Sequence, residues 1–168
     1  MKGTPRRAGS GTGARRRVPP LIVVRPVRRA DLERVIAIDA MVTGLRKQDY
    51  WRSVYRRYGS VDNDARRFLV AEGDGRVLGF VIGEIRDWEF GSPPCGWVFA
   101  ISVDPSARLS GIGTKLLDAI AQAFRRKGVT KLRTLLSRNN TLILSFFRSQ
   151  GMTAGSLLPL EMDLPESG

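Results

Sequence analysis

A glycine-bearing junction between a strand pattern and a helix pattern constrains the fold of this chain most. The apolar run 97–103 is typical of a strand, and Pro105 ends it because proline has no N–H for a strand ladder. Gly111 and Gly113 follow. The next stretch carries apolar residues at helical spacing, namely Ile112, Leu116, Leu117, Ile120 and Phe124. The first amides of such a helix lack intrahelical partners and lie at the positive end of its dipole, so the junction predicts an anion site suited to a phosphate or pyrophosphate.

Two familiar phosphate-binding loops fit this junction poorly. A P-loop requires Gly-Lys followed by Ser or Thr, and Lys115 stands in the wrong place for that pattern. A dinucleotide-binding loop requires a third glycine, which is missing. What remains is Arg-x-x-Gly-x-Gly, filled by Arg108, Gly111 and Gly113. At this point, a glycine turn that merely begins a helix is the alternative.

A second segment, from Asn140 to Met152, carries the features of a ligand-binding helix. Asn140 can begin a helix and hydrogen-bond an amide-rich ligand. Ile143 and Phe146 stand at core-facing helical spacing, and Gly151 can supply the left-handed residue that ends the helix. An ordinary amphipathic helix followed by glycine would show about half of these features.

In this order and spacing, the two segments resemble the acyl-CoA site of the GNAT superfamily of N-acetyltransferases. The first resembles the pyrophosphate loop, and the second the later part of the cofactor site. The resemblance covers residues 21–164 and implies an α/β fold. A GNAT fold of this kind has a mixed, mostly antiparallel central sheet of six to seven strands, splayed at the cofactor strand and flanked by about four helices.

One residue departs from the family pattern. Phe147 stands where the family usually has a tyrosine, whose hydroxyl is the usual proton donor for the departing CoA thiolate. Phenylalanine can pack against the thioester end but has no proton to give. Because a thiol with a pKa of about 8.5 leaves tolerably as a thiolate, acetyl transfer remains the prediction and the general acid stays unassigned. A non-catalytic acyl-CoA-binding regulatory module is the alternative.

The resemblance implies that acetyl-CoA is the co-substrate and that the backbone holds most of it. Pantetheine would hydrogen-bond unpaired backbone groups of the cofactor strand, as an added strand would. The pyrophosphate would lie on the loop amides, with Lys115 nearby. The implied cofactor-binding residues are Ile101, Val103, Arg108, Leu109, Ser110, Gly111, Ile112, Gly113, Thr114, Asn140 and Phe147.

The implied reaction is direct attack of a primary amine on the thioester. An alkyl amine has a pKa of about 10.4, so a base or a water chain must take its proton. Glu84, in an otherwise apolar strand pattern, is the candidate base because partial burial would raise its pKa. The alternative is that Glu84 faces solvent or pairs with an arginine. Ser102 and a held water molecule are further options.

The acceptor site is expected at the break between the first two helices and at the end of the long strand. The predicted residues are Thr43, Tyr50, Trp51, Asp87 and Glu89. Their aromatic character and mixed charge favour an amine on a protein or peptide, either a lysine side chain or an N-terminal α-amine. A small polycation generally requires a denser acidic pocket, so acetylation of a small-molecule amine is the alternative.

Hydrophobic patterning predicts the order of elements around these motifs. Asp31 is the expected N-cap of the first helix, which Thr43-Gly44 ends, and a second helix follows through Tyr58. Further helices are expected after Gly111 and after Asn140. The predicted strands cover 21–27, 68–71, 77–88, 97–103, 131–136 and 157–164, with Asp74-Gly75 as a hairpin turn.

Composition excludes several classes of protein. The 168 residues contain one cysteine, Cys95, and no histidine, which excludes an internal disulfide framework, a histidine-based triad and a histidine metal site. We therefore expect a cytoplasmic enzyme without a metal, as a monomer or homodimer. No run approaches the roughly 20 apolar residues of a membrane span, so no membrane partner is expected.

The net charge of +12 is concentrated at the start of the chain. Residues 1–20 contain six Lys or Arg and no acid, and we expect them to form a disordered basic tail. A solubilising extension is the preferred interpretation, and weak contact with nucleic acid or the ribosome is the alternative. Residues 165–168 are expected to be a C-terminal tail outside the domain.

Overall fold

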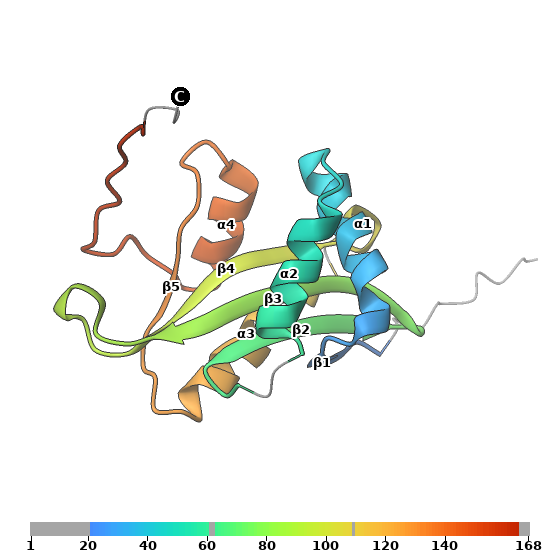
Figure 1. Cartoon of the computed structure of the whole chain (residues 1–168), viewed down its shortest axis with the longest axis horizontal. Coiled ribbons are helices and arrows are strands. Elements are labelled where there is room, and N and C mark those ends of the chain that lie inside the picture. Colours follow the sequence, from blue (N-terminus) through green and yellow to red (C-terminus); the bar gives the residue numbers. More distant parts are fainter. Residues whose placement is uncertain (1–20, 61–62, 109, 165–168) are drawn as a thin grey trace, which may run out of the picture.

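The computed structural model describes residues 21–60, 63–108 and 110–164, except for the side chain of Phe90. These residues form a five-stranded sheet in the order β1-β2-β3-β4-β5. The strands are β1 (Val23–Pro26), β2 (Arg66–Gly73), β3 (Arg76–Arg86), β4 (Cys95–Val103) and β5 (Leu132–Thr134). The helices are α1 (Leu32–Thr43), α2 (Gln48–Tyr58), α3 (Ile112–Arg125) and α4 (Thr141–Ser149) (Figure 1). Short 3-10 turns cover Arg29–Asp31, Glu89–Gly91 and Pro105–Ala107.

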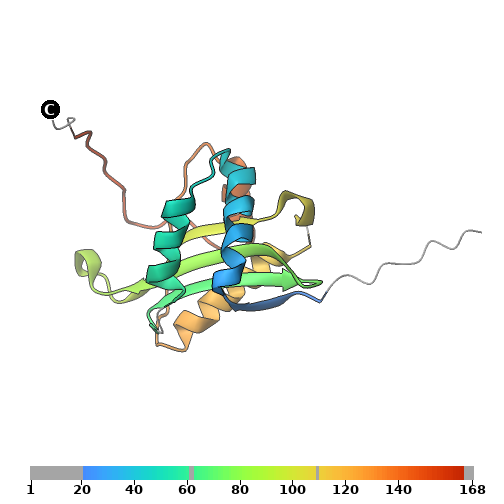
Figure 2. The same cartoon turned by 45° about the vertical axis from the view of Figure 1, so that its right-hand side comes forward.

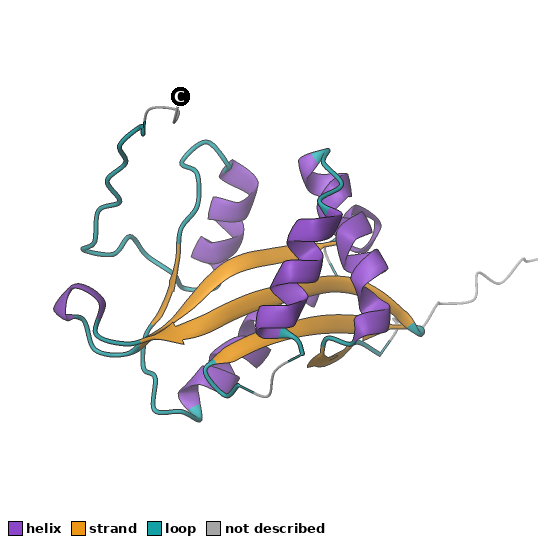
Figure 3. Ribbon diagram, viewed as in Figure 1, coloured by secondary structure: helices purple, strands orange, loops and turns teal. Residues whose placement is uncertain are grey.

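Helices cover both faces of the sheet and so divide the core in two. α1 and α2 lie on one face, where Val35, Ile36 and Trp51 pack with Phe68 and Phe80 (Figures 1 and 2). α3 lies on the opposite face and packs its apolar stripe against the sheet. α4 stands beside the sheet near β4 (Figure 3). This is the layered α/β arrangement that the order of elements predicts.

Three strand glycines let α3 approach the sheet closely. A Cβ atom at Gly79 would lie 3.2 Å from Leu116, and one at Gly83 would lie 3.0 Å from Ile120. A Cβ atom at Gly96 would lie 2.5 Å from the ring of Phe124. α3 therefore packs against a row of glycines on the sheet surface, and this close packing fixes the position of its N-terminus relative to β4.

The sheet splays where β4 meets β5. All of β4 pairs antiparallel with residues 79–86 of β3. The pairing has an irregularity at Phe99, because Ile82 pairs with Ala100 and Gly83 with Val98. β5 pairs with β4 in parallel only over Gly96–Val98. Beyond Val98, β4 continues to Val103 without β5 beside it. The splay predicted at the cofactor strand is thus present.

The predicted closing strand over 157–164 does not form, so the sheet has five strands rather than six to seven. This segment is extended and has no strand partner among the described residues. Its apolar side chains are exposed, with 70% of Leu158 and 87% of Leu160 accessible. The three-residue β5 offers a short edge for pairing, and Pro159 has no N–H to donate to it.

Asp31 stands immediately before α1, as predicted, but its side chain makes no cap hydrogen bond to that helix. Its carboxylate instead accepts a 2.7 Å bond from the Arg28 amide and pairs with the Arg25 guanidinium at 2.7 Å. The hydrogen bond from Arg25 outweighs burial and holds the pKa of Asp31 below its ordinary value. The competing arginine explains the different role of this carboxylate.

The predictions for the two tails lie outside the described residues. Within those residues, no helix has both the length and the apolar character of a membrane-spanning segment.

Candidate functional site

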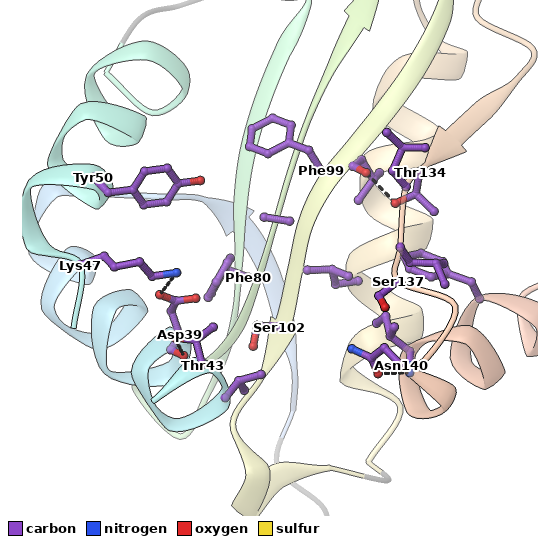
Figure 4. A pocket seen from close by; sticks show the side chains of 18 of the residues that line it. Asp39, Thr43, Lys47, Tyr50, Phe80, Phe99, Ser102, Thr134, Ser137 and Asn140 are labelled. Carbon is purple, nitrogen blue, oxygen red and sulfur yellow. Dashed lines mark hydrogen bonds and ion pairs between the residues drawn. The ribbon is translucent and has the colours of Figure 1, made fainter. Parts of the chain in front are cut away.

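A cavity of about 340 Å³ opens where β4 and β5 separate. α1 and α2 line one side of it, and α4 with the chain that follows β5 lines the other (Figure 4). The floor is formed by Phe80 of β3 and by Phe99–Ser102 of β4. Segments far apart in the sequence therefore converge on one opening in the sheet. The cavity includes Ile101 and Ser102, but not Val103, which ends β4 opposite Gly79.

The two glycines of the predicted anion loop have different structural roles. Gly111 precedes α3 with a φ of +73°, and a Cβ atom there would meet nothing within 4 Å. Gly113 lies inside the first turn, where a Cβ atom would come within 3.0 Å of the Phe146 ring. Gly111 therefore makes an open left-handed turn, whereas Gly113 lets α4 pack against α3. The sequence predicts that both glycines bind the cofactor, and it gives no sign that Gly113 contacts α4.

Other predicted loop residues surround the start of α3. Ile112 is buried under the helix, while Thr114 and Lys115 follow in its first turn. Ser110 is exposed, and its hydroxyl donates a hydrogen bond to the Ala107 carbonyl. Arg108 immediately follows the Pro105–Ala107 turn. Leu109 lies outside the described residues.

Asp104 anchors the beginning of this loop and was missed from the sequence. Its carboxylate accepts bonds from the Ser106 amide at 2.9 Å and the Ser106 hydroxyl at 2.8 Å. It also pairs with Arg34 of α1 and, at 2.9 Å, with Arg76 of β3. Burial raises its pKa, but the Ser106 bonds and the two arginines outweigh burial and leave the pKa below its ordinary value. A turn-forming aspartate two residues before a serine was the available signal.

α4 contributes the opposite wall of the cavity. Asn140 caps the helix as predicted, because its Oδ1 accepts a 3.2 Å bond from the Ile143 amide. Its amide nitrogen then faces the cavity (Figure 4). Phe147 lines the cavity and is only 4% exposed. Gly151 has a φ of +83° and follows the helix, in agreement with its predicted role as the terminating residue.

The α1–α2 side carries a buried carboxylate that the sequence analysis did not identify. Thr43, Tyr50 and Trp51 line the cavity together with Asp39 and Lys47, and the predicted role of the first three in binding the acceptor stays a prediction. Trp51 Nε1 donates a 2.9 Å bond to Asp39 Oδ2, and Lys47 Nζ lies 3.0 Å from the same oxygen. Lys47 Nζ also lies 5.6 Å from the centre of the Tyr50 ring. A charged residue within the apolar stripe of α1 was the signal that pointed to Asp39.

The predicted base and two predicted acceptor residues do not line this cavity. Glu84 accepts bonds from the Tyr58 hydroxyl and from Arg86 Nε, each at 3.0 Å. Burial, followed by the bond to Glu84, raises the pKa of Tyr58. These contacts match the alternative in which Glu84 pairs with an arginine, and its role as a base stays a prediction. Asp87 and Glu89 lie in the hairpin between β3 and β4, where Glu89 is 3.8 Å from Arg86.

A comparison with known families decides the identity of this arrangement. The sequence profile described as "Acetyltransferase (GNAT) family" matches residues 33–152, which include the anion loop and α4. The chain belongs to the GNAT acetyltransferase family.

Two curated GNAT relatives match over part of their length. Over 90 residues, the chain is 36% identical to L-2,4-diaminobutyric acid acetyltransferase of Nocardia farcinica, covering 54% of this chain and 45% of that protein. Over 95 residues, it is 32% identical to mycothiol acetyltransferase of Sanguibacter keddieii, covering 56% of this chain and 30% of that protein. The chain therefore spans less than half the length of these two relatives.

A solved structure shares the GNAT fold. The aminoglycoside N-acetyltransferase AAC(6')-Iy, in complex with CoA, superposes with a TM-score of 0.75 at 21% identity. The match covers 87% of this chain and 98% of that one. At this level of identity, the likeness concerns the fold alone.

Among the residues that the structure describes, no three His, Cys, Asp or Glu side chains gather in a way that could hold a metal ion.

Proposed function

We propose that this GNAT chain transfers the acetyl group of acetyl-CoA to the primary amine of a small molecule. The observation that carries the proposal is the opening between β4 and β5, where one cavity is lined by β4 and α4 and also by α1 and α2. A thin acyl-CoA arm could lie along β4 and present its thioester inside the cavity. An amine could reach the thioester from the α1–α2 side.

The described residues fit the parts of acetyl-CoA. The open left-handed turn at Gly111 exposes the first amides of α3, which suits a pyrophosphate, and Arg108 adds positive charge nearby. β4 beyond Val98 lacks a strand on its β5 side and suits the amides of pantetheine. The Asn140 amide nitrogen offers a further donor from α4.

The proposed reaction needs no covalent enzyme intermediate. The amine, after losing a proton to water, attacks the thioester carbonyl carbon and forms the C–N bond, and the nitrogen then gives a second proton to water. The C–S bond breaks, and the electron pair leaves on sulfur. The thiolate takes up a proton, so one ammonium ion and one thioester yield an amide, CoA thiol and one proton. Phe147 cannot supply that proton, and solvent can supply it because a thiol pKa is only about 8.5.

Two observations favour a small acceptor over the protein amine preferred from the sequence. The cavity volume of about 340 Å³ lies within the range of small-ligand sites. The names of the two curated relatives also point to small molecules, diaminobutyric acid and mycothiol. A lysine or N-terminal amine of a protein remains the second candidate, and it predicts turnover with peptides.

Substitution of Gly111 tests the acyl-CoA site. We expect Gly111→Glu to abolish acetyl-CoA binding measured by isothermal titration calorimetry, because it adds a side chain and a negative charge where the pyrophosphate would lie. Gly75→Glu is the matched control, since Gly75 also has a left-handed φ, of +72°, and open surroundings but lies in the β2–β3 turn. Normal binding by Gly111→Glu would contradict the assignment of the loop.

Release of CoA thiol separates an enzyme from a non-catalytic acyl-CoA-binding module. The assay uses acetyl-CoA with a panel of diamines, amino acids, aminoglycosides and lysine peptides. We expect thiol release with at least one small amine. Binding of acetyl-CoA without thiol release from any acceptor would favour the regulatory module.

A further inference from the structure

The three buried aspartates of the described chain differ in how their oxygens are used. Asp31 and Asp104 each receive hydrogen bonds or ion pairs on both carboxylate oxygens. Asp39 receives both of its side-chain contacts, from Trp51 and Lys47, on Oδ2. Among the described residues, nothing donates a hydrogen bond to Asp39 Oδ1, although only 9% of the surface of this residue is exposed. Asp39 lines the cavity, so this oxygen is available to a ligand there.

A carboxylate buried at this position is expected to lower the stability of the fold. Asp39 belongs to the face of α1 that buries Val35, Ile36 and Ile38 against the sheet. Removing a carboxylate from water is unfavourable unless partners replace the lost hydration. Trp51 and Lys47 compensate one oxygen only. The other oxygen has no donor among the described residues and belongs to a side chain that Trp51 and Lys47 hold in place beside the cavity, which suits a ligand's ammonium group.

Lys47 places the opposite charge at the same opening. Of the residues that line the cavity, only Asp39 and Lys47 are ionisable to a full charge at neutral pH. The Lys47 ammonium lies 3.0 Å from Asp39, and 37% of its side chain is accessible, so it can turn toward a ligand without crossing the core. Figure 4 shows both side chains beside the cavity, facing β4 across it. The acceptor side thus offers one anion and one cation with no net charge.

We propose that Asp39 and Lys47 bind the head group of an α-amino acid that carries a second amine. Asp39 Oδ1 accepts hydrogen bonds from the α-ammonium group, and Lys47 Nζ donates to the α-carboxylate. The second amine extends toward β4, where the acetyl thioester would lie. This inference rests on the proposed acetyl transfer and specifies its acceptor.

The charge balance opposes two other classes of acceptor. A polycation such as an aminoglycoside would meet a single carboxylate that Lys47 already neutralises, whereas polycations need several acids. A simple diamine could donate to Asp39 Oδ1 but would bring no anionic group to Lys47. An α-amino acid brings a donor for Asp39 Oδ1 and an acceptor for Lys47 Nζ, so both charged side chains gain a contact.

Two pairs of substrates isolate the carboxylate. Lysine is compared with cadaverine, and 2,4-diaminobutyrate with 1,3-diaminopropane, because the members of each pair differ only by that group. We expect the better amino acid of the two to exceed its decarboxylated partner in kcat/KM by about tenfold to a hundredfold, as one charge-assisted hydrogen bond would give. The difference should lie mainly in KM. A direct titration of the same ligands into CoA-bound protein gives a readout that does not require turnover.

Two variants assign the effect to the ion pair. Lys47→Met should bring the ratio of kcat/KM between the amino acid and its decarboxylated partner close to one. Arg46→Met is the control, because it alters only an exposed pair with Glu33 and should keep this ratio. Asp39→Asn should weaken binding of both members of a pair by at least about tenfold and leave acetyl-CoA binding unchanged. Asparagine retains an oxygen for Trp51 Nε1, and Glu33→Gln on the same helix is its control. If Asp39→Asn fails to fold, Lys47→Met decides.

The outcomes separate this inference from the proposed function. Equal kcat/KM and equal binding for amino acids and their decarboxylated partners would overturn the head-group site and leave acetyl transfer intact. A preference that survives Lys47→Met would also overturn it. Failure of every amine to release CoA thiol would overturn the proposed function, and in that case the titrations alone decide whether Asp39 and Lys47 bind an α-amino acid.

Discussion

Asp104 holds together three parts of the chain that meet at the anion loop. It caps the turn after β4 through Ser106, and its carboxylate pairs with Arg34 and Arg76 from two other elements. Asp104 itself is 3% exposed, whereas its two arginine partners reach toward solvent. Its lowered pKa means that the folded state binds this proton more weakly than the unfolded chain does. The ionised carboxylate therefore stabilises the fold above the unfolded pKa, and that contribution is lost as pH falls through the folded pKa.

Substitution of this residue should affect stability in a pH-dependent way. We expect Asp104→Asn to lower the free energy of unfolding at pH 7 by about 1–3 kcal/mol, because the buried carboxylate loses its charge-assisted contacts with Ser106 and with the two arginines. The difference from the wild type should shrink below about pH 4, because there the unfolded chain takes up this proton before the folded carboxylate does. Urea denaturation at pH 7 and pH 3 measures both effects.

The control for this comparison is Asp49→Asn. The Asp49 side chain is 98% exposed in its pair with Arg52, so its loss should change stability by less than about 0.5 kcal/mol. A gap between Asp104→Asn and the wild type that stays constant down to pH 3 would contradict the role of ionisation.

At the scale of elements, the contact between α3 and the sheet places the anion loop. Gly79, Gly83 and Gly96 face the helix from two neighbouring strands, and each has a helix side chain within van der Waals contact of the Cβ position. The start of α3 can therefore lie close to the end of β4. Gly113 then lets α4 pack against α3, which brings the two family motifs side by side.

Adding a single methyl group to this row of glycines should destabilise the protein. We expect Gly83→Ala to cost about 1–3 kcal/mol, because its Cβ would press on Ile120 and on the Trp97 carbonyl oxygen. Gly155→Ala is the matched control, since nothing lies within 4 Å of its Cβ position and its φ is not left-handed, so its effect should be below about 0.5 kcal/mol. Thermal unfolding followed by circular dichroism compares the two variants, and equal midpoints would show that the sheet yields to the helix.

At the scale of the whole molecule, the last described segment of the chain lies outside the hydrophobic core. Met152 packs against the cluster under α3, whereas Leu158, Leu160, Met162 and Leu164 are each at least 70% exposed. This final extended segment buries little apolar surface and so contributes little to the stability of one copy of the chain. Whether the protein is a monomer or a homodimer stays a prediction.

Removal of the final segment tests this division. A chain that ends at Thr153 should keep its free energy of unfolding within about 1 kcal/mol of the full chain, because exposed side chains contribute no burial. A chain that ends at Gln150 also lacks Gly151 and Met152, so it should be less stable by more than that. Urea denaturation of the three lengths is the measurement. A large loss on ending at Thr153 would show that the segment docks in solution.

The sequence by itself determined the features that a few neighbouring residues encode. The helix after Gly111, the Asn140 cap, the Gly151 terminator and the splay beyond β4 all follow from periodicity, capping chemistry and the family motifs. These signals act within one or two helical turns, so they can be recognised without knowing what lies opposite. They were sufficient to predict the fold family, and the roles of the cofactor-binding residues stay predictions.

Only the tertiary structure decided which distant residues meet. Asp39 lies at the cavity in contact with Lys47 and Trp51, which come from the start of α2, and Glu84 contacts Tyr58 and Arg86 outside the cavity. The alternating leucines after residue 157 predict a strand, but β5 is too short to pair with them. Burial of a charge and pairing of a strand depend on segments remote in the sequence, and local patterns carry no information about them.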